Sequence, residues 1–178
     1  MKNRNNDNCR IYFCGTPGTG KTTIAKIISD KYRLKYVEIN DLIVENDLYL
    51  GIDILRNSLI VDEETLTVHL EEIILSTPRL CLVGHPIMLS ESIKRIIDEI
   101  FLIRCRPGAL RQRLQQRNYS RSKIEENVEA EIMDIVKEDA KEIFGRNVIE
   151  IDTTTQSIQE TIMYIQQVLE RTKEIKKI

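Results

Sequence analysis

The sequence lacks the features that mark nucleic-acid-coating, membrane and secreted proteins. Its 26 Lys and Arg residues nearly balance 28 Asp and Glu residues, for a net charge of -2, so we expect no direct DNA binding. It contains no apolar run near the roughly 20 residues that a membrane helix needs. Residues 1–8 also lack the apolar core of a signal peptide. We therefore expect an intracellular protein without membrane attachment.

Signals for zinc and disulfides are missing too. The four cysteines, Cys9, Cys14, Cys81 and Cys105, form no CxxC pair and show no zinc-ligand spacing. Cys14, Cys81 and Cys105 fall in or beside apolar, strand-like runs. We therefore expect all of them to be small, buried, reduced thiols.

The chain does contain one domain's worth of alternating apolar strands and helices. Its 178 residues, 42% hydrophobic and 30% charged, suffice for one core and not comfortably for two. Strand-like runs cover 10–14, 35–39, 79–84, 99–105 and 147–152. Helical spacing covers 21–32, 39–47 (capped by Asn40 or Asp41), 62–76, 90–98, 107–118, 122–144 and 157–177. We predict a loose tail over 1–9 and, over 10–178, a doubly wound five-stranded parallel α/β sheet with helices on both faces.

The segment "GTPGTGKT", Gly15 to Thr22, fits the Walker A pattern GxxxxGK[ST] between a strand and a helix. Its glycines let backbone N–H groups converge on phosphate oxygens, and the following helix directs its positive end to the same place. We expect Lys21 to reach the β- and γ-phosphates and Thr22 to give its hydroxyl to Mg²⁺. The predicted nucleotide-binding residues are Gly15, Pro17, Gly18, Thr19, Gly20, Lys21, Thr22 and Thr23. A glycine-rich turn with a surface lysine is the alternative, and the flanking strand and helix disfavour it.

Five segments in order carry a narrower resemblance: "GTPGTGKTT", "DLIVENDLYLGID", "IVDEETL", "GHPIMLS" and "LIRCRPGALRQRLQQRNYSRSKIEENVEAEI". Over about residues 10 to 170 the chain resembles the adenylate kinase isoenzyme 6 family, small P-loop proteins of the nucleus and of archaea. The resemblance implies a P-loop NTPase fold with a monophosphate-binding region at 46–61 and a short lid at 117–123. It implies phosphoryl transfer from ATP to AMP or a related monophosphate, and ATP hydrolysis.

The resemblance also implies partners and a location. Eukaryotic members assist maturation of the small ribosomal subunit by binding one of its ribosomal proteins. We would therefore expect such a partner, and a location in nucleus and cytoplasm if the source is eukaryotic and in the cytoplasm otherwise.

Site roles follow from the resemblance and from spacing. Arg113 and Arg117 lie four residues apart on a predicted helix, so they share a face and suit a clamp on the transferring phosphoryl. The expected catalytic residues are Lys21, His85, Arg113 and Arg117, with Arg104 at the nucleotide and Asp41, Tyr49, Gly51 and Asp53 at the acceptor. For several of these a plainer alternative stays open. Arg113 and Arg117 could belong to a solvated basic helix, and Asp41 could cap a helix. Tyr49 and Asp53 could belong to a polar loop, and His85 could be a structural histidine.

The turn after the third predicted strand departs from the family pattern. That pattern is Asp-x-His, and this chain has Val83-Gly84-His85. The missing aspartate would accept hydrogen bonds from magnesium-bound waters, and no acidic residue nearby in sequence replaces it. The sequence therefore leaves two hypotheses, a kinase and ATPase that turns over slowly or a weakly catalytic ATP-binding assembly factor. A kinase of a small metabolite such as shikimate or gluconate is a third, disfavoured by the Leu-Tyr-x-Gly-x-Asp and lid segments.

Overall fold

A five-stranded parallel sheet forms the centre of the protein in the computed structural model, which describes residues 8–56, 58–145 and 148–175. Its order is β2-β5-β1-β6-β7, with every neighbouring pair parallel. The strands are β1 (Cys9–Cys14), β2 (Lys35–Glu38), β5 (Arg79–Gly84), β6 (Glu99–Arg104) and β7 (Val148–Asp152). The predicted doubly wound sheet is confirmed.

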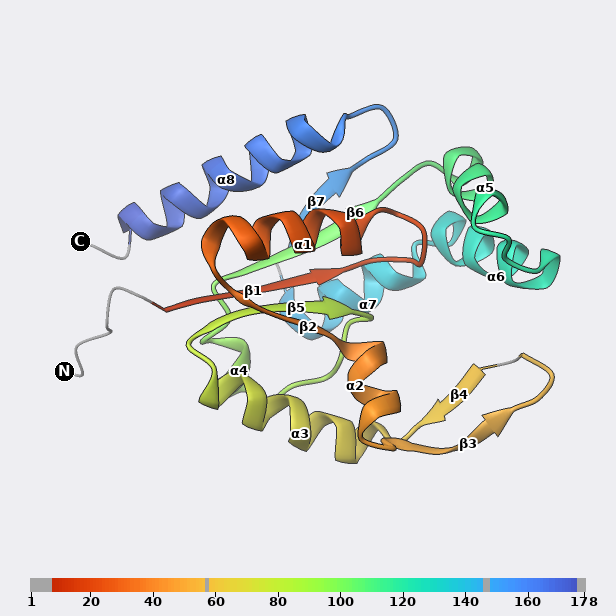
Figure 1. Ribbon diagram of the computed structural model, residues 1–178, viewed down its shortest axis with the longest axis horizontal. Coiled ribbons are helices and arrows are strands. Elements are labelled where there is room, and N and C mark those ends of the chain that lie inside the picture. Colours follow the sequence, from red (N-terminus) through yellow and green to blue (C-terminus); the bar gives the residue numbers. More distant parts are fainter. Residues whose placement is uncertain (1–7, 57, 146–147, 176–178) are drawn as a thin grey trace.

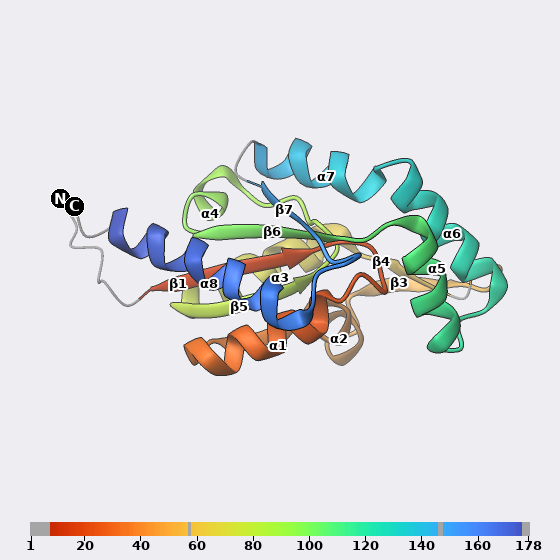
Figure 2. The same ribbon diagram turned by 90° about the horizontal axis from the view of Figure 1, so that it is seen from above.

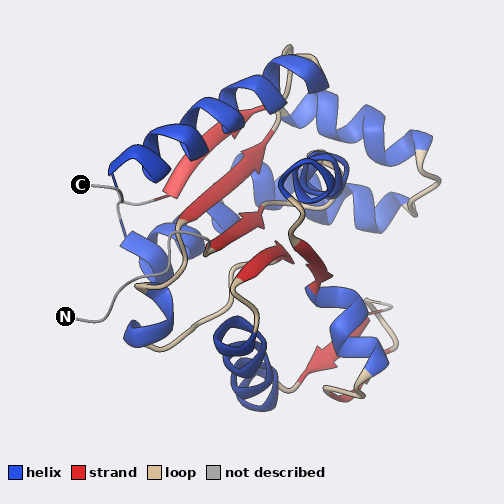
Figure 3. Cartoon of the chain, turned by 60° about the vertical axis from the view of Figure 1, so that its left-hand side comes forward, coloured by secondary structure: helices blue, strands red, loops and turns tan. Residues whose placement is uncertain are grey.

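Helices cover both faces of this sheet (Figure 3), and α1 and α7 lie on opposite sides of it (Figure 2). One core cluster packs Ile11, Phe13 and other strand residues against α1 (Lys21–Tyr32) and α8 (Ile158–Ile175). The other packs Tyr12 and Cys14 against α2 (Ile39–Glu45), α3 (Glu63–Ser76), α4 (Glu91–Lys94) and α7 (Ile135–Phe144). Because successive strand residues point to opposite faces, near-continuous apolar strands serve both clusters.

Two hairpins project from the edge where β1 ends (Figure 1). One pairs α5 (Pro107–Gln116) with α6 (Arg121–Ile132) around their own apolar cluster, and the predicted lid at 117–123 covers its turn and the first residues of α6. There Asn118 adopts φ 56°, the positive value that asparagine tolerates. The other pairs the antiparallel strands β3 (Tyr49–Asp53) and β4 (Ser58–Val61) and occupies most of the predicted monophosphate-binding region.

Two predicted boundaries and one predicted helix cap were wrong. β1 already includes the buried Cys9, which we had placed in the tail; residues 1–7 lie outside the described ranges. Helix α2 begins at Ile39 with Glu38 at its N-cap, so neither Asn40 nor Asp41 caps it. Helix α4 spans only four residues, because Asp98, which we had assigned to it, exchanges hydrogen bonds with the backbone of Arg10 beside β1. The last predicted helix is described up to Ile175 as α8 (Ile158–Ile175), and its predicted residues 176 and 177 lie outside the described ranges.

The long helix predicted over 122–144 is also wrong, since it breaks between α6 and α7. Asp134 has φ 56° at the break. Arg104 donates to the backbone oxygen of Glu131 at 3.0 Å, a carbonyl that an uninterrupted helix would give to the N–H four residues on. The same guanidinium pairs with the carboxylate of Asp134. Arg104 therefore replaces the hydrogen bonds that the residues at the break would make in a continuous helix.

The remaining whole-chain expectations concern cysteines and membranes. All four cysteines are buried and remain thiols, as predicted. In the described ranges, no helix is both long enough and apolar enough to cross a membrane.

Gly84, the last residue of β5, gives a stability prediction. A Cβ atom added there would lie 2.8 Å from the Cβ of Ile39, the first residue of α2. We expect Gly84→Ala to lower the free energy of unfolding by about 1–3 kcal/mol through overpacking. Chemical denaturation measures this, with Gly108→Ala as the control, since nothing lies within 4 Å of a Cβ at that position. Equal stability of Gly84→Ala and the natural chain would contradict the close packing of α2 on β5.

Candidate functional site

The loop from Gly15 to Thr22, which we call the phosphate loop, requires glycine at Gly15 and Gly18 both for its backbone conformation and for its packing. Gly15 and Gly18 have φ of 146° and 92°, in the region that L-residues rarely adopt. A Cβ at Gly15 would lie 2.2 Å from the backbone oxygen of Ile103, and one at Gly18 would lie 2.8 Å from the Leu114 side chain. The loop is therefore packed tightly between the end of β6 and helix α5.

The start of α1 is open to an anion. Gly20 is the N-cap residue and no side chain caps the helix, so the first N–H groups are available to phosphate oxygens. Lys21 reaches back along the loop, with Nζ 3.4 Å from the backbone oxygen of Thr16. Burial lowers the pKa of Lys21, while the nearby carboxylate of Glu38 opposes that shift.

A cavity of about 220 Å³ lies beside this loop. Two predicted catalytic residues, Arg113 and Arg117, line it together. Arg113 donates to the backbone oxygens of Thr19 at 3.2 Å and Thr153 at 2.7 Å. The guanidinium of Arg117 has no hydrogen bond or ion pair to any other residue in the described ranges, and the side chain is exposed. The structure thus brings two of the predicted arginines to the phosphate loop, one of them held in place and one available.

The loop after β7 completes that cavity, and our sequence reasoning missed it. Thr153 is buried, and its hydroxyl donates to the backbone oxygen of Thr19 at 2.7 Å. Gln156 and Thr161 line the same cavity. The sequence signal was present, because "DTTT" follows the last strand at the edge of the sheet where ligands of this fold class bind.

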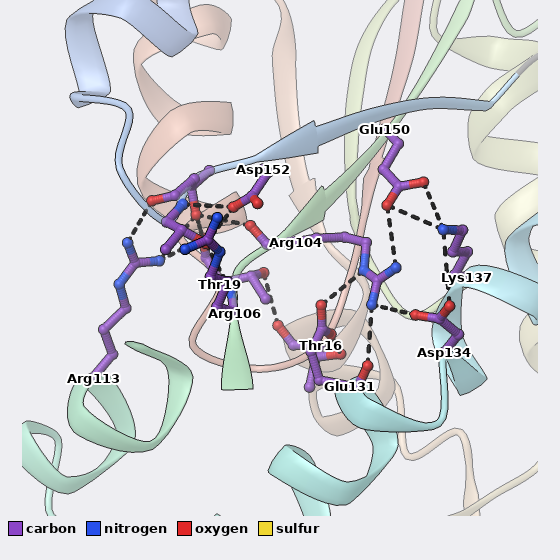
Figure 4. Close-up of polar contacts among 12 residues, drawn as sticks. Thr16, Thr19, Arg104, Arg106, Arg113, Glu131, Asp134, Lys137, Glu150 and Asp152 are labelled. Atoms are coloured by element: carbon purple, nitrogen blue, oxygen red, sulfur yellow. Dashed lines mark hydrogen bonds and ion pairs between the residues drawn. The ribbon is translucent and has the colours of Figure 1, made fainter. Parts of the chain in front are cut away.

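Arg104, which we predicted to contact the nucleotide, lies in a network of carboxylates (Figure 4). It is within 2.8 Å of Glu131 and 3.1 Å of Glu150, and it also pairs with Asp134. Glu131 is buried and accepts a further 2.5 Å hydrogen bond from the hydroxyl of Thr16 in the phosphate loop. The network therefore ties the loop to the end of α6.

The charge of Arg104 is secured by these partners. Burial alone would lower the pKa of the guanidinium, but hydrogen bonds and ion pairs with Glu131 and Asp134 outweigh it and raise the pKa. With its donors directed at protein acceptors, Arg104 is placed to position the loop. A direct contact between Arg104 and nucleotide remains a prediction.

Thr22, the predicted metal ligand, faces a carboxylate that we had not singled out. Its hydroxyl donates to Glu38 at 3.3 Å. Glu38 is the last residue of β2, and its register partner on β5 is Val83, where the family pattern has aspartate. Val83 itself is fully buried in the core cluster beneath α1. A clue lay in the sequence, since Glu38 is the one acid of the strand-like run "KYVEI" and lies near its carboxyl end.

His85 follows β5 at the same edge and is half-exposed. Its Nε2 lies 3.5 Å from Asp139 on α7. Burial lowers the pKa of His85, Asp139 opposes the shift, and the charge of Lys21 adds to it. The predicted catalytic role of His85 stays a prediction.

The four predicted acceptor residues lie apart from the 220 Å³ cavity. Asp41 is exposed in the first turn of α2, whereas Tyr49, Gly51 and Asp53 belong to β3. Asp53 accepts a 3.0 Å hydrogen bond from the backbone N–H of Arg56, which helps close the hairpin. None of the four lines that cavity, so any acceptor site that they form is a separate one.

The comparisons with other proteins narrow the family. A family model described as "AAA domain" matches residues 11–134. A protein named "Putative adenylate kinase" from Methanosarcina barkeri is 37% identical over 90% of this chain and 85% of its own length. A relative with the same name from Methanocaldococcus jannaschii is 34% identical, covering 94% and 89%. The "Adenylate kinase isoenzyme 6 homolog" of Schizosaccharomyces pombe is 35% identical, covering 90% and 89%.

Solved structures agree on the fold alone. A shikimate kinase from Bacteroides thetaiotaomicron superimposes with a TM-score of 0.60 at 17% identity, covering 91% of this chain and 98% of its own. A gluconokinase from Sinorhizobium meliloti gives 0.57 at 14% identity, covering 94% of both chains. Both structures share the α/β fold of this chain, but their sequence identity to it is about half that of the adenylate kinase relatives. The chain therefore belongs to the adenylate kinase isoenzyme 6 family of P-loop proteins.

Proposed function

We propose that this protein transfers the γ-phosphoryl group of ATP to AMP or a related nucleoside monophosphate. An oxygen of the acceptor phosphate attacks the γ-phosphorus, the bond to the β,γ-bridging oxygen breaks, and with AMP two ADP molecules result. One observation carries the proposal: in a chain of this family, Gly20 at the uncapped start of α1 and Arg117 line one cavity, and Lys21 follows Gly20 directly. Phosphoryl transfer needs such positioning and positive charge more than it needs covalent chemistry.

Each part of the cavity has a role in this proposal. Backbone N–H groups from Gly18 to Lys21 receive the β- and γ-phosphates, and Lys21 neutralises their charge. Arg113 fixes Thr19 and Thr153, which shape the cavity wall. Arg117 then supplies a guanidinium to the oxygens of the transferring group. The nucleoside end of ATP would occupy the part of the cavity near Gln156 and Thr161.

Mg²⁺ fits the residues that the structure brings together. In the described ranges no three His, Cys, Asp or Glu side chains cluster to hold a metal by themselves. Thr22 and Glu38 nevertheless present hard oxygen donors side by side, and Mg²⁺ is commonly held by one or two protein groups together with phosphates and waters. When bound, the ion would neutralise charge on the β- and γ-phosphate oxygens.

We assign the acceptor monophosphate to the space beside the β3–β4 hairpin. The hairpin and the α5–α6 pair project from the same edge of the sheet, on either side of the phosphate loop (Figure 1). A monophosphate between them would face the γ-phosphate. Contacts from Asp41, Tyr49, Gly51 and Asp53 to that acceptor remain predictions, as do ATP hydrolysis and a part in small-subunit ribosome maturation through a ribosomal protein.

The second candidate is a weakly catalytic ATP-binding assembly factor, favoured by the valine at position 83. Its one sequence argument was that no carboxylate replaces the missing aspartate. Glu38 beside Thr22 weakens that argument. We therefore place the kinase first.

Lys21→Ala tests the phosphate loop. We expect it to abolish nucleotide-dependent turnover, because the loop loses the cation that neutralises the phosphates. Lys31→Ala, which removes an exposed lysine in the last turn of the same helix, should keep full activity. Measured as ADP formation with Mg²⁺, unchanged turnover in Lys21→Ala would remove the basis for the proposed reaction.

Arg117→Ala tests the arginine that has no protein partner. We expect kcat to fall about 10²-fold or more, as for loss of one group that stabilises transition-state charge. The melting temperature should stay within error, because the side chain is exposed and unpaired within the described ranges. Arg171→Ala, which removes an exposed arginine on α8 outside the lid, is the matched control. If both variants show the same kcat, Arg117 has no role in transfer.

A further inference from the structure

The valine at position 83 leaves a chemical gap that the rest of the sheet edge has to fill. The hydroxyl of Thr22 is placed for a magnesium ion, but an aliphatic side chain accepts no hydrogen bond from the waters of that ion. Groups that accept hydrogen bonds from the ligands of a metal ion typically contribute tenfold to a hundredfold in metal affinity or activity. A protein that works without one is inefficient, and a protein that works well must draw the carboxylate from elsewhere.

Strand register shows where that carboxylate lies. Glu38 on β2 is the direct parallel partner of Val83 on β5, and neighbouring strands are only about 4.8 Å apart. Val83 points into the core cluster beneath α1, and Tyr36, two residues before Glu38, packs against that same cluster. Because residues two apart on a strand share a face, Glu38 points to the α1 side as well. Compared with the family pattern, the carboxylate therefore lies on the neighbouring strand, β2, at the same level of the sheet.

The contacts of Glu38 match this position. Its Oε2 accepts a 3.3 Å hydrogen bond from Thr22 and another from the hydroxyl of Tyr36. Glu38 is also the N-cap residue of α2, yet its side chain makes no capping hydrogen bond. The carboxylate is therefore directed to the phosphate loop and not used to begin the helix that follows it.

Tyr36 helps to hold this arrangement. Its ring lies beneath the Lys26 ammonium group, 5.5 Å from the ring centre. Its phenol donates a hydrogen bond to the carboxylate of Glu38. Tyr36 is in this sense a positioning residue, and the charge that matters belongs to Glu38.

We propose that Glu38 supplies the magnesium-organising carboxylate of this protein, in place of the aspartate that β5 lacks. The inference rests on the proposed function, in that it needs a nucleotide on the phosphate loop. It changes how Val83 is understood: this valine fills the core below α1, while the acidic role passes to β2. It further assigns Thr22 and Glu38 to one oxygen-donor pair.

Glu38→Gln tests this with a readout other than activity. A fluorescent ATP analogue is titrated into the natural chain and into Glu38→Gln, once with EDTA and once with saturating Mg²⁺. We expect the tightening caused by Mg²⁺ to fall about tenfold or more in the variant. In EDTA the variant should bind as tightly as the natural chain or more tightly, because one negative charge near the phosphates is gone.

Glu72→Gln is the matched control, since Glu72 is an exposed glutamate on α3, and it should keep the full effect of Mg²⁺. Equal tightening in the two variants would overturn the proposal. Weaker binding by Glu38→Gln in EDTA would overturn it too, because Glu38 would then shape the nucleotide pocket and not the metal site. If the natural chain and Glu72→Gln bind no nucleotide in either condition, the proposed function itself fails.

Discussion

The site depends on how tightly the phosphate loop is enclosed. The end of β6 lies so close to Gly15 that no side chain fits at that position. Helix α5 excludes a side chain at Gly18 in the same way. A buried carboxylate, Glu131, joins the loop at Thr16 to Arg104 and to the α6–α7 junction. A buried charge is stable only when it is paired and hydrogen-bonded, and breaking one partner of such a pair is strongly destabilising. These contacts join the loop to the sheet and to the α5–α6 pair.

That enclosure determines which arginines remain available for chemistry. Arg104 has its donors directed at Glu131, Asp134 and Glu150, and Arg113 holds two backbone oxygens. Arg117 lies one helical turn beyond Arg113, at the end of α5 and beside the same cavity. The three arginines lie near one another but have different roles. Arg104 and Arg113 hold the site together, and Arg117 is available to contact a ligand.

Much of this could be predicted from the sequence, and the misses have physical causes. Local patterns sufficed for the sheet, the phosphate loop and the turn at Asn118, because each depends on residues adjacent in the chain. The break before α7 depends on Arg104, a residue of the distant strand β6. The carboxylate beside Thr22 depends on the register of β2 with β5. The sequence alone indicates that position 83 lacks the aspartate of the family pattern. It does not indicate that Glu38, 45 positions earlier, lies next to Val83 in the sheet.

The most direct measurement of the central claim is ADP formation from ATP and Mg²⁺, with and without AMP. If the loop, Arg117 and the Thr22–Glu38 pair form a working transfer site, ADP should accumulate much faster with AMP than without it, at two ADP for each ATP consumed. A protein that binds ATP normally but forms ADP at the same negligible rate with and without AMP would contradict the account and favour an ATP-binding assembly factor.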